Sequence, residues 1–78
     1  MNRYEIDFTC TCLMNSDEVA YHLTIESEQT IMAEDIERAV DEISGAALHE
    51  AIADKLAALG GTQTITATHG RVLVTTFR

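Results

Sequence analysis

The chain has 78 residues, a formal net charge of −8 and a hydrophobic fraction of 46%. This length allows one domain with one core, and the negative charge opposes binding to phosphates, nucleic acids and anionic lipids. We therefore expect a single domain over residues 1–78 that does not bind nucleic acid directly. Its charge serves solubility or favours a protein partner with a basic surface.

The sequence contains no signal for a membrane or for secretion. No segment has the ~18 consecutive apolar residues that a membrane-spanning helix needs. Glu5 and Asp7 stand where a signal peptide would carry its apolar segment. Two cysteines, Cys10 and Cys12, are fewer than a small secreted domain usually has. The sequence therefore predicts a cytoplasmic protein.

An alternating pattern at the start of the chain predicts a β-hairpin. Apolar and polar side chains alternate over residues 4–14 and again over residues 19–26, which is typical of strands with one buried face. A turn at Ser16-Asp17 would match every inward side chain of one strand with an inward side chain of the other. The predicted pairs are Met14 with Val19, Cys12 with Tyr21, Cys10 with Leu23, and Phe8 with Ile25.

Two apolar stripes at helical spacing follow, the second rotated around the axis relative to the first. The stripes consist of Ile36, Val40, Ile43 and Ala47, and of Leu48, Ile52, Leu56 and Leu59. Ser44-Gly45 separates them, and glycine is unfavourable inside a helix. We therefore predict two helices, or one sharply kinked helix, over about residues 32–43 and 46–59. Thr30 would cap the first helix and Gly60-Gly61 would end the second.

A second hairpin is predicted from Thr62 to Phe77, with its turn at His69-Gly70. This turn would pair Ala67 with Val72 and Ile65 with Val74. The element order ββααββ then predicts an α+β two-layer fold, in which the helices cover one face of a four-stranded antiparallel sheet. The uncovered face would carry Thr64, Thr66, Thr68, Leu73, Thr75 and Phe77.

The cysteines and histidines do not predict a metal site or a cofactor. Cys10 and Cys12 point the same way from one strand, which suits neither a disulfide nor a redox turn. Zinc would need two further ligands. His22 lies on the opposite face, and His49 and His69 are distant in the sequence. We therefore expect both cysteines to pack in the core.

No motif of an enzyme is present. The sequence lacks a serine elbow, a paired-histidine metal motif and a glycine-rich phosphate loop. His49 and Glu50 are adjacent, but neighbouring residues on a helix point about 100° apart. We therefore expect a protein without catalytic activity. A small enzyme or ligand-binding domain is an alternative, with a site that only the fold or a dimer interface assembles.

The predicted first helix carries a cluster of acidic residues. Three of them follow one another at helical spacing, about 5 to 6 Å apart, which resembles the spacing of phosphates along a nucleic-acid strand. The cluster is either a solvated helix face or a surface for a basic protein partner. Its members are Glu34, Asp35, Glu37, Asp41 and Glu42.

The uncovered sheet face suggests a different interaction. Leu73 and Phe77 would lie in water there beside Thr66 and Thr75. Large exposed apolar groups on a flat sheet are typical of an interface, so self-association into a homodimer is the alternative to the acidic surface. The strand propensity of threonine equally explains the threonines.

In length, acidity, strand–helix–strand build and lack of catalytic motifs, the chain resembles the small phage and mobile-element proteins that act as anti-CRISPR inhibitors. The acidic residues 34–37 and 41–42 carry this resemblance. The resemblance implies a non-catalytic protein of the host cytoplasm that blocks the basic surface of a nucleic-acid-binding complex. It transfers no functional residue.

Overall fold

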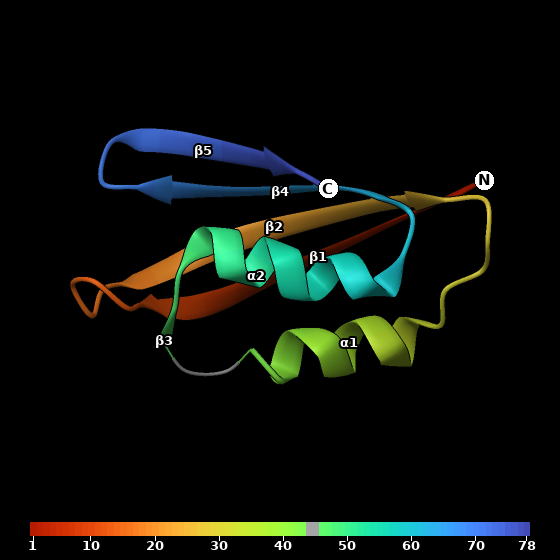
Figure 1. Cartoon of the computed structure of the whole chain (residues 1–78), viewed down its shortest axis with the longest axis horizontal. Helices are drawn as coiled ribbons and strands as arrows, with labels where there is room; N and C mark the ends of the chain where they lie inside the picture. The colour runs from red at the N-terminus through yellow and green to blue at the C-terminus, as the bar shows by residue number, and fades with distance from the viewer. Residues whose placement is uncertain (44–45) are drawn as a thin grey trace.

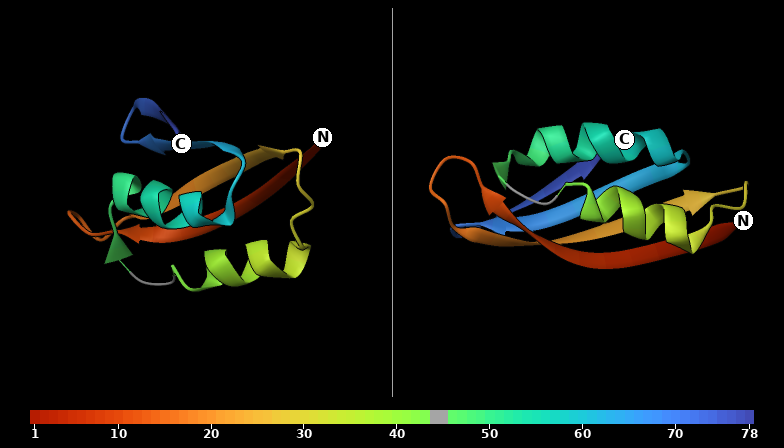
Figure 2. Two further views of the ribbon diagram at one scale, coloured as in Figure 1. Left: turned by 45° about the vertical axis from the view of Figure 1, so that its right-hand side comes forward. Right: turned by 90° about the horizontal axis from the view of Figure 1, so that it is seen from below.

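A long hairpin forms the middle of a sheet, and two helices lie on one of its faces (Figures 1 and 2). The computed structural model describes residues 1–43 and 46–78. Strand β1 (Asn2–Cys12) pairs antiparallel with β2 (Glu18–Ser27), and β4 (Thr62–His69) pairs antiparallel with both β2 and β5 (Val72–Phe77). The predicted α+β fold of order ββααββ is confirmed.

A short strand, β3 (Ala46–Ala47), adds to this sheet in parallel with the end of β1, so that the strand order is β3-β1-β2-β4-β5. The sequence pattern predicts a helix at residues 46 and 47, and this prediction is wrong. Two residues carry no periodic pattern of their own, and only the neighbouring β1 backbone makes them a strand.

The first hairpin has the predicted faces but not the predicted register. Cys10 lies opposite Val19 instead of Leu23, a shift of four residues. The turn is longer than predicted, because the Cys12 N–H donates to the Asp17 carbonyl (2.7 Å) and the Ser16 N–H donates to the Cys12 carbonyl (2.9 Å). An even shift keeps each side chain on its face, so the inward set is unchanged.

The second hairpin shows the same kind of difference. Ala67 lies opposite Val74 instead of Val72, and the turn is at Gly70-Arg71 instead of His69-Gly70. Gly70 has φ of +63° and takes the first central position of the two-residue turn, where such turns favour glycine. The shift of two residues again leaves both faces as predicted.

The helices are shorter than the apolar stripes suggested. Helix α1 spans Ala33–Asp41, and α2 spans His49–Leu56 and continues as a 3₁₀ turn, η1 (Ala57–Leu59). Met32 occupies the N-cap position of α1 in place of the predicted Thr30, and its side chain makes no capping hydrogen bond. The predicted break at Ser44-Gly45 lies outside the described residues. None of the helices in the described part of the chain is long and apolar enough to cross a membrane.

Both helices lie on the same side of the sheet, which therefore has one covered and one open face (Figure 2). The covered face holds the core. Its largest fully buried side chains come from β2, β4 and α2, as the alternating and helical patterns predicted. They are Leu23, Ile25, Ile52, Leu56 and Ile65.

Candidate functional site

Two histidines that are 20 residues apart in the sequence meet in the structure. His49 is the first residue of α2, and His69 is the last residue of β4. The Nδ1 atom of His49 lies 3.0 Å from the Nε2 atom of His69, within hydrogen-bonding distance. Neither the periodicity nor the spacing of the sequence indicates this contact, so the sequence predicts no site that contains both residues.

Aromatic rings continue from this pair into the sheet. The Tyr21 ring centroid is 5.4 Å from that of His49 and 6.1 Å from that of His69. On its other side Tyr21 stacks on Phe8, with the centroids 5.2 Å apart. Rings from β1, β2, α2 and β4 therefore form one aromatic cluster, in which Phe8 and Tyr21 are stacked and the two imidazole rings are tilted against Tyr21 and each other.

A pocket of about 410 Å³ opens beside the two histidines, within the size range of small-molecule sites. Its wall is mainly apolar, with a thiol, a carboxylate, a phenol and two imidazoles among the polar groups. We call it the histidine pocket; it is lined by Cys12, Met14, Tyr21, Ala47, Leu48, His49, Glu50, His69 and Val74.

The His49 imidazole is held in its neutral form. Burial lowers the pKa of His49, and the charges of His69 and Arg78 lower it further, while Glu50 and the Ile65 carbonyl oppose the shift. Among the described residues, no group forms a well-aligned hydrogen bond to its buried Nε2 atom. A neutral imidazole both donates and accepts a proton, which an acid–base site requires.

Tyr21 keeps its proton as well. Burial raises the pKa of Tyr21, and the neighbouring Cys10 and Cys12 thiols raise it further. At neutral pH, its hydroxyl is therefore a hydrogen-bond donor at the pocket wall.

The two cysteines have different environments. Cys10 is 4% exposed, and its thiol donates to the Ile43 carbonyl (3.6 Å), so it packs in the core as predicted. Cys12 is half-buried and lines the histidine pocket. It also lines an adjoining hollow together with Asp17 and His69. The prediction of a purely core role therefore does not describe Cys12.

Within residues 1–43 and 46–78, no three His, Cys, Asp or Glu side chains are arranged to hold a metal ion.

The acidic cluster predicted for the first helix lies on the exposed side of α1, which buries Ile36 and Val40 instead. Arg38 pairs with Asp35 at 3.1 Å, so part of the negative charge is neutralised locally. No member of the cluster is among the residues that line the histidine pocket. The structure thus keeps Glu34, Asp35, Glu37, Asp41 and Glu42 on one surface, away from the pocket.

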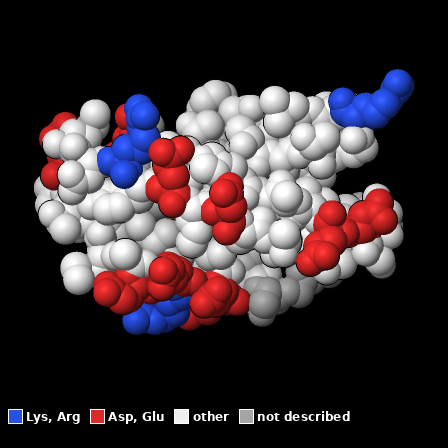
Figure 3. Space-filling model, turned by 180° about the vertical axis from the view of Figure 1, so that it is seen from behind, with Lys and Arg blue, Asp and Glu red and all other residues white. Residues whose placement is uncertain are grey.

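The open sheet face carries the residues predicted for self-association. Leu73 and Phe77 are 66% and 69% exposed, and Thr66 lies directly opposite Thr75. Over β4 and β5 this face has little charge, whereas acidic side chains gather over β1 and along α1 (Figure 3). Self-association through this face stays a prediction.

A third histidine lies on the open face in a different setting. The His22 ring lies 2.9 Å from Glu5 through Nε2 and 2.5 Å from Asp7 through Nδ1. Hydrogen bonds to Asp7 and then to Glu5 raise the pKa of His22. This cluster is ionic and exposed, unlike the buried histidine pair.

Comparisons with known proteins show the fold and no family. No protein-family model and no curated protein match the chain. A solved structure does match, the archaeosine synthase QueF-Like in the apo form, with a TM-score of 0.74 and 19% identity. The match covers 99% of this chain and 89% of that chain.

This match corrects the functional prediction. The chain shares the fold of a synthase over nearly its whole length, so the prediction of an anti-CRISPR-type phage inhibitor that blocks a basic surface is wrong. That prediction depended on length and acidity, which specify no fold. The same match does not support the expectation of a protein without catalytic activity, because in that neighbour the fold belongs to an enzyme.

Proposed function

We propose that this chain is a small-molecule-binding domain of the enzyme type, and that the histidine pocket is its site. The observation that carries the proposal is the 3.0 Å contact between the His49 and His69 rings at the wall of a 410 Å³ pocket. The neighbour named an archaeosine synthase supports it, since a fold of this kind serves an enzyme there. The cytoplasmic location predicted from the sequence is part of the proposal.

The lining of the pocket favours a flat heteroaromatic ligand. The rings of Tyr21, His49 and His69 offer surfaces for stacking, and Leu48 and Val74 offer apolar contact. Polar groups are few and lie among these apolar surfaces, an arrangement that orients a ligand by its polar edge. Glu50 binds Arg78 through one carboxylate oxygen, and its other oxygen can accept a hydrogen bond from an N–H donor of such an edge.

The chemistry available at this wall is proton transfer. The two imidazoles exchange one proton across their contact, and the neutral His49 can take or give another. Cys12 adds a thiol on the same wall. These groups are those of an acid–base site rather than of a passive cavity.

Binding of guanosine and adenosine tests the proposal. We expect either nucleoside to shift the NMR signals of His49, His69 and Tyr21, and His69→Gln to weaken this binding at least tenfold. His22→Gln, on the open face, serves as the matched control and should bind as the wild type does. Absence of binding by both nucleosides, or equal binding by the His69→Gln variant, would overturn the proposal.

The open sheet face favours a second role, self-association into a homodimer. The exposed Leu73 and Phe77 on a weakly charged surface support it, because two copies with a net charge of −8 approach most easily where charge is low. Light scattering after size exclusion should give twice the monomer mass for the wild type. Phe77→Lys should return the protein to a monomer.

A further inference from the structure

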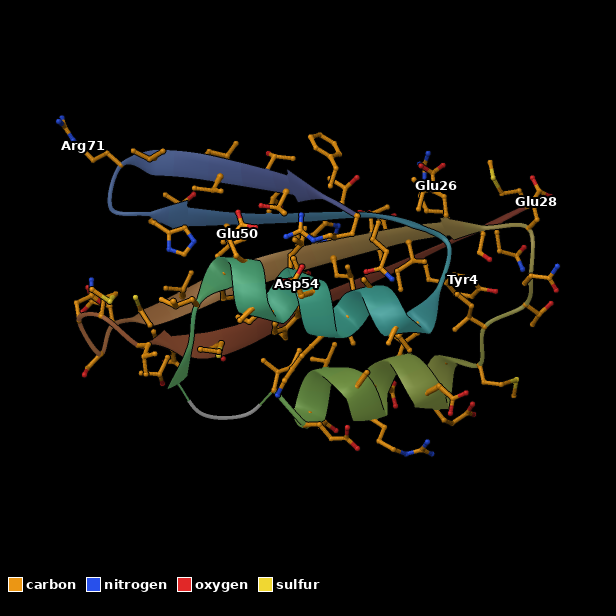
Figure 4. The ribbon with its side chains drawn as sticks, viewed as in Figure 1. Tyr4, Glu26, Glu28, Glu50, Asp54 and Arg71 are labelled. Atoms are coloured by element: carbon orange, nitrogen blue, oxygen red, sulfur yellow. The ribbon has the colours of Figure 1, made fainter. Side chains whose placement is uncertain are left out.

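The two histidines join α2 to the turn of the β4–β5 hairpin, in addition to the core contacts and the hydrogen bond from Gln63 to the Leu56 carbonyl (2.8 Å). His69 ends β4 at the turn of the β4–β5 hairpin, and His49 begins α2. At the opposite end of the hairpin, Arg78 binds Glu50 at 2.6 Å and Asp54 at 2.8 Å. Glu50 and Asp54 project from the side of α2 that faces β4 (Figure 4). The hairpin is therefore attached to α2 at both ends.

These two attachments respond differently to protons. The Arg78 guanidinium stays charged at every physiological pH, since its hydrogen bonds to Glu50 and Asp54 raise its pKa. The contact between two imidazoles needs one N–H donor and one bare nitrogen. When both rings are protonated, two N–H groups and two positive charges face each other, and the contact is lost.

The groups around the His49 ring offer little to offset a second positive charge. Tyr21 from β2 and Cys12 from β1 are neutral, and the Arg78 charge opposes protonation of His49. Glu50 on α2 favours the charged form, but it is already bound to Arg78. His69 is half-buried and next to the turn, so it is the ring that can move into water. Asp17 and Glu18 line a hollow with His69 that His49 does not line, so their charges attract a protonated His69 ring away from the contact.

We infer that the His49–His69 contact is a proton-controlled attachment, which holds the turn of the β4–β5 hairpin against α2 and closes the histidine pocket until a second proton binds. Release would separate two walls of the pocket, because His69 and Val74 belong to the hairpin whereas His49 and Glu50 belong to α2. The part of this inference that concerns the regulation of ligand binding rests on the proposed function. The part that concerns the opening of the hairpin does not.

The test is amide hydrogen exchange of the ligand-free protein between about pH 7.5 and about pH 5, the range in which histidine titrates. After correction for the pH dependence of intrinsic exchange, we expect the opening equilibrium of residues 67–74 to change little above about pH 6.5. Below that pH it should rise, with a slope that approaches about tenfold per pH unit, as uptake of one proton requires. Amides through which β1 and β2 pair with each other should stay protected.

Two variants complete the test. His69→Gln lacks the repulsion between two charged rings, so the opening of residues 67–74 should depend on pH less steeply than in the wild type, with only the release of the buried His49 left to contribute. His49→Gln should lose the pH response, and it reports independently if one variant does not fold. His22→Gln should keep the wild-type response. Opening that ignores pH in the wild type, or a pH response that is undiminished in both His69→Gln and His49→Gln, would overturn the inference, and so would unfolding of the whole sheet in the same step.

Nucleoside binding at about pH 7.5 and about pH 5.5 then separates the two proposals. Opening of the hairpin without any nucleoside binding would contradict the proposed function alone. Binding at the higher pH without proton-linked opening would contradict the attachment alone.

Discussion

His22 and His49 are the same side chain in opposite environments, one on each face of the sheet. His22 lies on the open face between Glu5 and Asp7, which raise its pKa. His49 lies on the covered face, where burial lowers its pKa. Tyr21, which contacts His49, and His22 are neighbours in β2 and point to opposite faces of the sheet. Two adjacent residues of one strand therefore belong to an ionic surface and to a mainly apolar pocket.

The covered face should account for most of the stability. Leu23 is 1% exposed and packs in the core, so Leu23→Ala should lower the free energy of unfolding by about 2 to 5 kcal/mol. Leu73→Ala on the open face should change it by less than about 0.5 kcal/mol. Urea unfolding of both variants measures the difference. Equal losses would mean that the open face is covered in solution, by a second copy for example.

Gly60 and Gly61, which connect η1 to β4, both have backbone conformations that disfavour other residues. Gly61 has φ of +72°, and an added Cβ would lie 2.7 Å from the Glu26 carbonyl oxygen. Gly60 also has positive φ, at +90°, but nothing lies within 4 Å of its Cβ position. Gly60→Ala should cost about 1 kcal/mol through strain alone, and Gly61→Ala should cost more. The difference in Tm between the two variants, measured at one pH, gives the cost of the clash at residue 61 beyond the cost of the backbone strain.

The buried histidine should make stability depend on pH. Because the pKa of His49 is lowered on folding, the unfolded chain takes up the proton first, so stability is present above about pH 6.5 and falls as the pH drops below it. His49→Gln should remove this part of the pH dependence. Urea midpoints at several pH values measure it, and an unchanged slope in the variant would contradict the assignment.

The exposed histidine should show the opposite sign and a smaller effect. The pKa of His22 is raised on folding, so its contribution is fully present below about pH 6.5 and is lost as the pH rises through its folded value. Solvent and salt screen this exposed cluster, so its effect should shrink at high ionic strength. In His22→Gln the loss of stability with rising pH should disappear; a loss that persists would point to another group.

The sequence determined which face each strand residue occupies, because side chains alternate with a period of two whatever the register. It therefore placed Leu23, Ile25 and Ile65 in the core, and Leu73 and Phe77 on the open face. It did not determine the register. The pairing partners depend on the backbone of Ser16 and Gly70, both with positive φ, and the composition of a turn does not say which residue adopts it.

The tertiary structure alone decided the site. Cys12, His49 and His69 come from three elements, and each is unremarkable in its own segment of the sequence. Periodicity reports which side of an element is buried, but not where along the sheet a helix begins. The start of α2 opposite the end of β4 is what brings His49 to 3.0 Å from His69, and it follows from how the helices pack on the sheet.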